Sequence, residues 1–218
     1  MPVVAIVAYQ GVLADESEAF ASLFRAVPGA RVITVAAAVG VVAGVGGAPL
    51  ATATFDDSLN PAVVVVPGGL GSHHHPEVAA WVRTVTPRYI LASSTGSALL
   101  ATSGLLAGRR AATHWLAGPL LERHGVEAVT DRIAVDDPFV TCSGLGSAFD
   151  AALIIVRAIG GERMVDHVRA VLAEPEPAPA RCGRLGGRWR RRTRRALAPA
   201  VDPWTSVDIE LEDRPPDR

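Results

Sequence analysis

Short runs of mostly apolar, often β-branched residues recur along the first two thirds of the chain, and they constrain its fold more than any other feature. Each run is four to six residues long and has apolar side chains at both odd and even positions. Strands that are covered on both faces of a parallel sheet have this pattern. The predicted strands are residues 3–8, 30–35, 63–66, 89–93, 132–135 and 139–142.

Amphipathic segments separate these runs and predict helices. They cover residues 16–27, a stretch from His75, the residues after Ser94, and then 116–124, 146–159 and 162–173. The helix from 146 is expected to bury Phe149, Leu153 and Ile154 and to end at a glycine pair. Alternation of strands and helices predicts an α/β fold, a doubly wound, mostly parallel sheet with helices on both faces.

The composition changes abruptly after residue 173. Residues 1–173 are expected to form one domain, whereas 174–218 are rich in proline and arginine and lack the periodicity of a core element. We predict a disordered tail there. The net charge is -1, so contact with nucleic acid is expected only through the eight arginines of the Arg181–Arg195 run. The alternative is that this run of charge is simply solvated and binds nothing.

Cysteine content and hydropathy bear on localisation. Cys142 and Cys182 are the only cysteines and form no framework of spacings, which favours a reducing cytoplasm. Residues 1–8 lack the features of a signal peptide and are read as a strand. Residues 32–48 are apolar but interrupted by glycines and fall short of the ~20 strongly apolar residues of a membrane span.

The segment from Tyr89 to Ala101 is the most informative for chemistry. An apolar strand runs into small residues and then a helix, which is the layout of a nucleophile elbow. Ser94 is the side chain presented at this turn. The backbone N–H of Thr95, at the start of the helix, is a candidate donor to a developing anion.

Residues 63–71 form a second junction between a strand and a loop, Val-Val-Val-Val-Pro-Gly-Gly-Leu-Gly. Paired glycines let a backbone approach a ligand closely, so the amides of Gly69 and Leu70 are candidates to complete an anion hole facing Ser94. A plain tight turn explains the same residues.

The order of these motifs resembles the ThiJ/PfpI superfamily. Val-Pro-Gly-Gly precedes an elbow ending in Thr-Gly, followed by Gly-Leu-Leu, Gly-Arg, Thr-His-Trp and the stretch from Val135 to Asp150. The pattern is most similar to isonitrile hydratases and to the front domains of AraC-type regulators. The resemblance implies a flavodoxin-like, class I glutamine amidotransferase-like fold for residues 3 to about 171.

One position departs from the family pattern. The elbow of these relatives reads Cys-Thr-Gly, and here it reads Ser94-Thr95-Gly96. A hydroxyl is far less acidic than a thiol and needs a base beside it. Cysteine chemistry is therefore not transferred to this chain.

The resemblance also implies an acidic residue from the first loop beside the elbow, and its position corresponds to Glu16. As a buried carboxyl it would relay protons or accept a hydrogen bond from Ser94. Helix capping is the alternative, with Asp15 as N-cap and Glu16 as a first-turn acid. His114 is a candidate base for Ser94, and a histidine that ties a loop to the core is the alternative.

His73, His74 and His75 invite a metal interpretation, but no acidic or cysteine ligand is spaced to complete a site, so we predict no metal and no cofactor. They are expected either to line the pocket mouth or to be solvated. His75-Pro76-Glu77 is similar to the His-x-Glu part of a glutamine amidotransferase triad, but it comes before the elbow, and the elbow has no cysteine. Glutaminase activity is therefore not expected. Cys142 is interpreted as core packing and Asp150 as a local cap.

Two functional hypotheses follow. The first is an enzyme that hydrates or hydrolyses a small molecule in the family pocket. The second is a non-catalytic protein that binds a metabolite and has lost the cysteine nucleophile. A small-molecule ligand is expected in both, a homodimer is plausible by resemblance, and no membrane contact is expected.

Overall fold

The computed structural model describes residues 2–57 and 59–173, so the predicted tail, with Cys182 and the arginine run, lies outside the described residues. Eleven strands and five α-helices are present in the described part. The strands are β1 (Val3–Val7), β2 (Arg31–Ala36), β3 (Gly40–Val41), β4 (Leu50–Ala51), β5 (Ala53–Thr54), β6 (Val63–Val66), β7 (Tyr89–Ser93), β8 (Arg110–Ala112), β9 (Glu127–Val129), β10 (Ile133–Asp136) and β11 (Phe139–Cys142).

The α-helices are α1 (Ala14–Arg25), α2 (Pro76–Thr84), α3 (Gly96–Thr102), α4 (Gly118–Arg123) and α5 (Leu145–Ala173), and two 3-10 helices are η1 (Ser72–His74) and η2 (Trp115–Ala117). Gly161 interrupts α5 with a φ of 72°, where the sequence predicts two helices separated by a glycine pair. No helix among the described residues is both long enough and apolar enough to cross a membrane.

The central sheet has seven strands in the order β10-β11-β7-β6-β1-β2-β5. Its pairs are parallel except β10 with β11, which is antiparallel. The strand order reverses between β1 and β6, which defines the switch point at which ligands bind in doubly wound sheets. The predicted fold class is confirmed.

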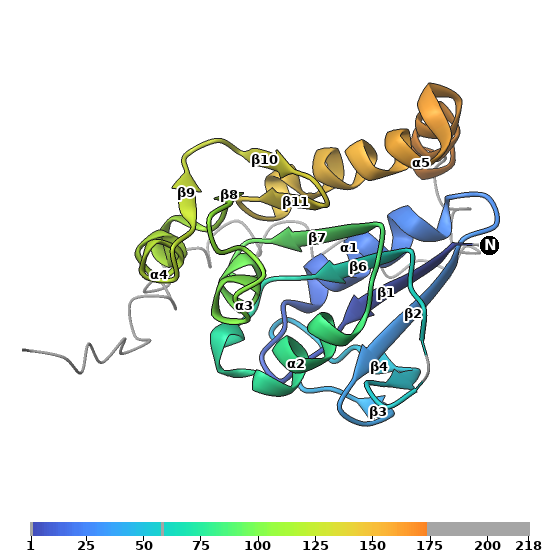
Figure 1. Ribbon diagram of the computed structural model, residues 1–218. Helices are drawn as coiled ribbons and strands as arrows, with labels where there is room; N and C mark the ends of the chain where they lie inside the picture. The colour runs from blue at the N-terminus through green and yellow to red at the C-terminus, as the bar shows by residue number, and fades with distance from the viewer. Residues whose placement is uncertain (1, 58, 174–218) are drawn as a thin grey trace, which may run out of the picture. The chain divides into compact units, whose positions relative to one another are not determined.

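Both faces of the sheet are covered (Figure 1), as the sequence predicts. Val4 and Ile6 point toward α1 and α5, whereas Ala5 and Val7 point toward α2, α3 and α4. This alternation along one apolar strand is why β1 has no polar face.

One core prediction is wrong. Phe149, expected on the buried face of its helix, is 42% exposed, whereas Leu153 is buried and Ile154 packs against the core. Phe149 lies in the first turns of α5, whose buried residues there are Ser147 and Ala148. The small side chains, not the aromatic one, face the sheet at this end of the helix.

The start of α3 packs directly against the end of β6. A Cβ atom on Gly96 would overlap the carbonyl oxygen of Val66 and lie 2.8 Å from that of Pro67. Backbone atoms cannot move aside as a flexible side chain can, so position 96 has room only for glycine.

We therefore expect Gly96→Ala to lower the free energy of unfolding by about 1–3 kcal/mol, the usual cost of overpacking. Gly146→Ala is the matched control, because a Cβ there meets no atom within 4 Å and its helix should gain roughly 0.5–1 kcal/mol. Urea denaturation measures both. Equal midpoints for Gly96→Ala and the wild type would contradict this account.

Candidate functional site

Three loops meet at the switch point of the sheet. They follow β1, β6 and β7 and therefore lie at the same edge, where the carboxyl ends of the parallel strands are. Two hydrogen bonds tie the first two loops together: Leu70 N–H donates to Gly11 O (2.9 Å), and Leu13 N–H donates to Gly68 O (2.8 Å). The loop between β1 and α1 is thus held against the loop after β6.

Ser94 connects β7 to α3 in a backbone conformation that few non-glycine residues adopt. Its φ is 55°, and it is the only described residue other than glycine with a positive φ. Hydrogen bonds hold it on both sides: Ser94 N–H donates to Cys142 O (2.8 Å), and Thr113 Oγ1 donates to Ser94 O (2.8 Å). Such strain persists only where surrounding structure enforces it and clusters at functional sites.

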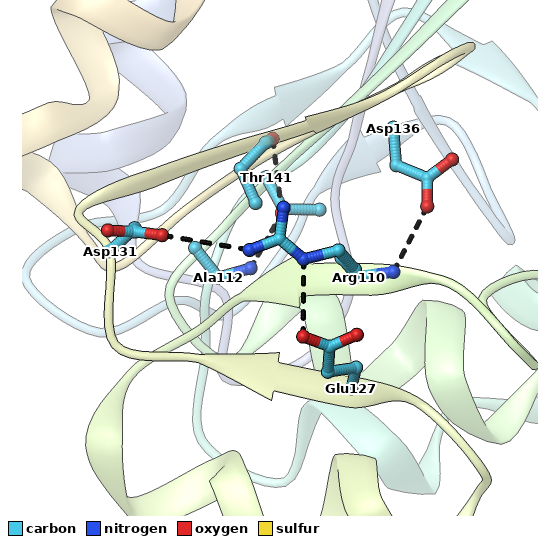
Figure 2. A network of polar contacts seen from close by, with 7 residues as sticks. Arg110, Ala112, Glu127, Asp131, Asp136 and Thr141 are labelled. Carbon is cyan, nitrogen blue, oxygen red and sulfur yellow. Dashed lines mark hydrogen bonds and ion pairs between the residues drawn. The ribbon is translucent and has the colours of Figure 1, made fainter.

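Thr113 directly follows β8, and this strand is fixed by a polar network around Arg110 (Figure 2). The Arg110 N–H donates to Asp136 (3.0 Å), and its guanidinium donates to Glu127 (3.2 Å). The exposed ion pair contributes little. Thr141 Oγ1, fully buried on β11, accepts a hydrogen bond from Ala112 N–H at 2.8 Å and joins β8 to the sheet next to the residue that holds Ser94.

Glu16 brings a buried carboxyl to the same place from the first turn of α1. It is 3% exposed, and its Oε2 accepts a hydrogen bond from Gly68 N–H at 2.8 Å. Burial raises the pKa of Glu16, and the hydrogen bond from Gly68 together with the nearby Ser93 hydroxyl offsets part of that rise. Asp15 is not the N-cap, because α1 begins at Ala14 and Leu13 occupies the N-cap position.

Gly68 packs closely against both Glu16 and Ser94. A Cβ at Gly68 would lie 2.7 Å from Ser94 Cβ, 3.0 Å from Ser94 Oγ and 3.2 Å from Glu16 Oε2. The hydroxyl and the carboxyl therefore lie against the same residue, and position 68 has no room for a side chain.

The predicted anion-hole amides of Gly69 and Leu70 already have partners. Gly69 N–H donates to Thr95 Oγ1 (2.9 Å), which in turn donates to Gly69 O (2.8 Å), and Leu70 N–H donates to Gly11 O. A ligand anion could use these amides only after these bonds open. The N–H of Thr95 precedes the first turn of α3, where no helical carbonyl is available to it.

His114 lies at the start of η2, one residue after Thr113. Its Nδ1 accepts a hydrogen bond from Leu116 N–H at 3.4 Å, and its ring packs 5.6 Å from that of Trp115. These contacts fit a histidine that fixes a loop. A role as base for Ser94 stays a prediction.

The three consecutive histidines follow the β6 loop. His75 is bound to Glu77 (2.9 Å) and to Gln10 O (3.0 Å), and the rings of His73 and His74 pack 3.9 Å apart. No group of three or more histidine, cysteine, aspartate or glutamate side chains within residues 2–57 and 59–173 is arranged to hold a metal ion.

Sequence reasoning missed Tyr9, which lies directly beneath the β6 loop. Its hydroxyl donates to Pro67 O at 2.7 Å. A Cβ on Gly69 would lie 2.7 Å from the tyrosine hydroxyl oxygen. Burial and the nearby charge of Glu16 raise the pKa of Tyr9 well above its usual value. Its place just after the first strand was the only signal that could have identified it.

Residues 3–158 match the DJ-1/PfpI family. The chain belongs to this family. It is 34% identical over 134 residues to an isonitrile hydratase from Pseudomonas putida, a match that covers 59% of this chain and 58% of that enzyme's length. The chain thus spans less than two thirds of this curated relative.

Solved structures of DJ-1/PfpI proteins share the fold. A THiJ/PfpI family protein from Pseudomonas syringae superposes with a TM-score of 0.72 at 23% identity, over 84% of this chain and 79% of that one. Drosophila melanogaster DJ-1beta gives a TM-score of 0.71 at 22% identity, over 78% and 97%. The superfamily resemblance inferred from the motifs is confirmed.

The raised pKa of Glu16 predicts how its replacement affects stability. The folded-state pKa of this carboxyl lies above its unfolded value of about 4.3. Its contribution to stability is therefore fully present below about pH 4.3, and it is lost as pH rises through the folded-state pKa. Glu16→Gln keeps an acceptor for Gly68 and cannot ionise. We expect it to melt at a higher temperature than the wild type at pH 7, with a difference that shrinks toward pH 4.

Thermal melts from pH 4 to pH 8 measure this difference. Asp150→Asn, an exposed carboxyl on α5, is the control and should show no comparable trend. A Glu16→Gln variant less stable than the wild type at neutral pH would show that the buried carboxylate is well stabilised, against this account.

Proposed function

We propose that this protein adds water to a small neutral molecule at the site between Ser94 and Glu16, and that isonitriles are the substrate class to test first. The observation that carries the proposal is that a strained serine and a buried carboxyl both lie against Gly68. The likeness to an isonitrile hydratase supports the choice of substrate.

Glu16 is suited to donate a proton, because its raised pKa keeps the carboxyl protonated at a higher pH than an exposed glutamate. In the proposed reaction, Glu16 protonates the terminal carbon of the isonitrile, and an oxygen nucleophile adds to the same carbon. The Glu16 carboxylate left by this transfer then accepts the proton that the nucleophile loses. Net addition of water gives an N-substituted formamide.

Two oxygen nucleophiles are consistent with this site. Ser94 can attack as in an elbow, forming an imidate ester that water hydrolyses, or it can hold the attacking water by a hydrogen bond. The Thr95 N–H lies beside the same turn and supports charge that develops there. The two routes differ in one observable, because only the first adds the mass of the isonitrile to the protein.

The test is turnover of alkyl and aryl isonitriles by the purified chain, followed by NMR of the formamide proton. We expect activity in the wild type and at least a 100-fold loss in Ser94→Ala, within the usual range for removing an acid, base or nucleophile. Ser103→Ala is the control, because this buried serine directly follows α3 and its hydroxyl donates to Leu100 O in that helix.

Ser94→Cys separates this proposal from the alternative, a non-catalytic protein that binds a metabolite. The missing thiol and the occupied amides of Gly69 and Leu70 favour that alternative. An inactive wild type that binds isonitriles unchanged, beside an active Ser94→Cys variant, would establish a binding protein with an intact pocket.

The predicted homodimer stays a prediction. Exposed apolar side chains gather between β2 and β5, with Val39, Val41 and Leu50 each more than half exposed. Beside them a groove of about 360 Å³ runs along α1, lined in part by Glu18 and Arg25. If light scattering finds a dimer, Val39, Val41 and Leu50 are the first residues to substitute.

A further inference from the structure

Ser93, the residue before Ser94, has a hydroxyl that the fold leaves without a partner. It ends β7 and is 0% exposed, and its Oγ is the only buried side-chain oxygen or nitrogen in the described part of the chain that makes no hydrogen bond of full geometry. A buried polar group left unpaired costs about 1–3 kcal/mol. Alanine would fill nearly the same space without that cost, so the serine calls for an explanation.

The surroundings of this hydroxyl are polar and belong to the site. Ser93 follows Leu91 by two residues and so points to the same face, toward α1 and α5. Its partner in register is Cys142 on β11. The hydroxyl lies near enough to Glu16 and to Cys142 to lower the pKa of each, although it forms no hydrogen bond with either in the structure.

A hydroxyl is matched to a carboxyl that changes its protonation state. It can donate to the carboxylate and, after rotating, accept from the carboxylic acid. Gly68 N–H, the other partner of Glu16, can only donate. A hydroxyl that can rotate, because it has no fixed partner, can therefore hydrogen-bond to Glu16 in both protonation states. A hydroxyl already held by another partner could bond to only one of them.

We propose that Ser93 is a positioning residue that supports Glu16 both as acid and as carboxylate, so that the same side chain can give a proton and take it back. This inference rests on the proposed function for its purpose, but the contact itself does not need turnover. The other titratable groups that face Glu16 are Tyr9, two residues after β1, and Cys142. Burial raises the pKa of both.

The experiment is a titration of Glu16 in the full chain, by carbon NMR of protein labelled at the glutamate carboxyl. The Glu16 resonance is assigned by its loss in Glu16→Gln. Removing a donor to the carboxylate disfavours the charged form, so Ser93→Ala should move the midpoint of Glu16 to higher pH. Ser93→Thr, which keeps the hydroxyl, should return it toward the wild-type midpoint.

Ser97→Ala is the matched control, because Ser97 is also fully buried and its Oγ donates to Ala112 O at 2.9 Å. It should leave the Glu16 midpoint unchanged and lower the melting temperature. Ser93→Ala should keep or raise the melting temperature, since it removes an unpaired buried group. An unchanged midpoint in Ser93→Ala would overturn the inference.

Turnover assays separate this inference from the proposed function. If the midpoint moves in Ser93→Ala while neither the wild type nor Ser94→Cys hydrates any isonitrile, the contact stands and the proposed reaction fails. If the wild type turns over isonitriles and Ser93→Ala has the same titration and the same pH profile of activity, the reaction stands and the role of Ser93 is wrong.

Discussion

The hydrogen bond from Gly68 N–H to Glu16 Oε2 is the contact on which the site depends. It joins the first turn of α1 to the loop after β6, two segments that are 52 residues apart in the chain. A carboxyl taken into a protein interior loses its hydration, and a backbone N–H restores part of what it loses. Because residue 68 is glycine, its backbone can lie close to both Glu16 and Ser94. A larger residue would have to displace one of these two side chains.

Much of the fold could be predicted because its central strands are buried on both faces. β6, β7 and β11 begin and end at the predicted residues, and α2 begins one residue after the predicted His75. Five strands of two or three residues, β3, β4, β5, β8 and β9, were not predicted as such. Strands this short have no periodicity to detect. They exist because the fold brings a partner beside each: β3 pairs with β4, β8 with β9, and β5 with the longer β2.

The site was predictable at its centre but not in its second layer. Ser94 follows from motif order and Glu16 from the family resemblance, and the structure places both against Gly68. The partners of Gly69 and Leu70 could not be predicted, because they come from Thr95 and from the loop after β1. Only folding brings these segments together. Ser93 left one trace in the sequence, a hydroxyl at the end of an otherwise apolar strand.

Serine in place of cysteine changes what the neighbouring acid must do. A thiolate would place a negative charge beside Glu16 and raise the pKa of the carboxyl further. A neutral hydroxyl adds no such charge, and it also supplies no anionic nucleophile. In the proposed reaction, chemistry therefore begins with a proton given to the substrate, and the base needed afterwards is the Glu16 carboxylate left behind. A substrate that becomes electrophilic on protonation, and carries no charge of its own, would meet both requirements of this buried site.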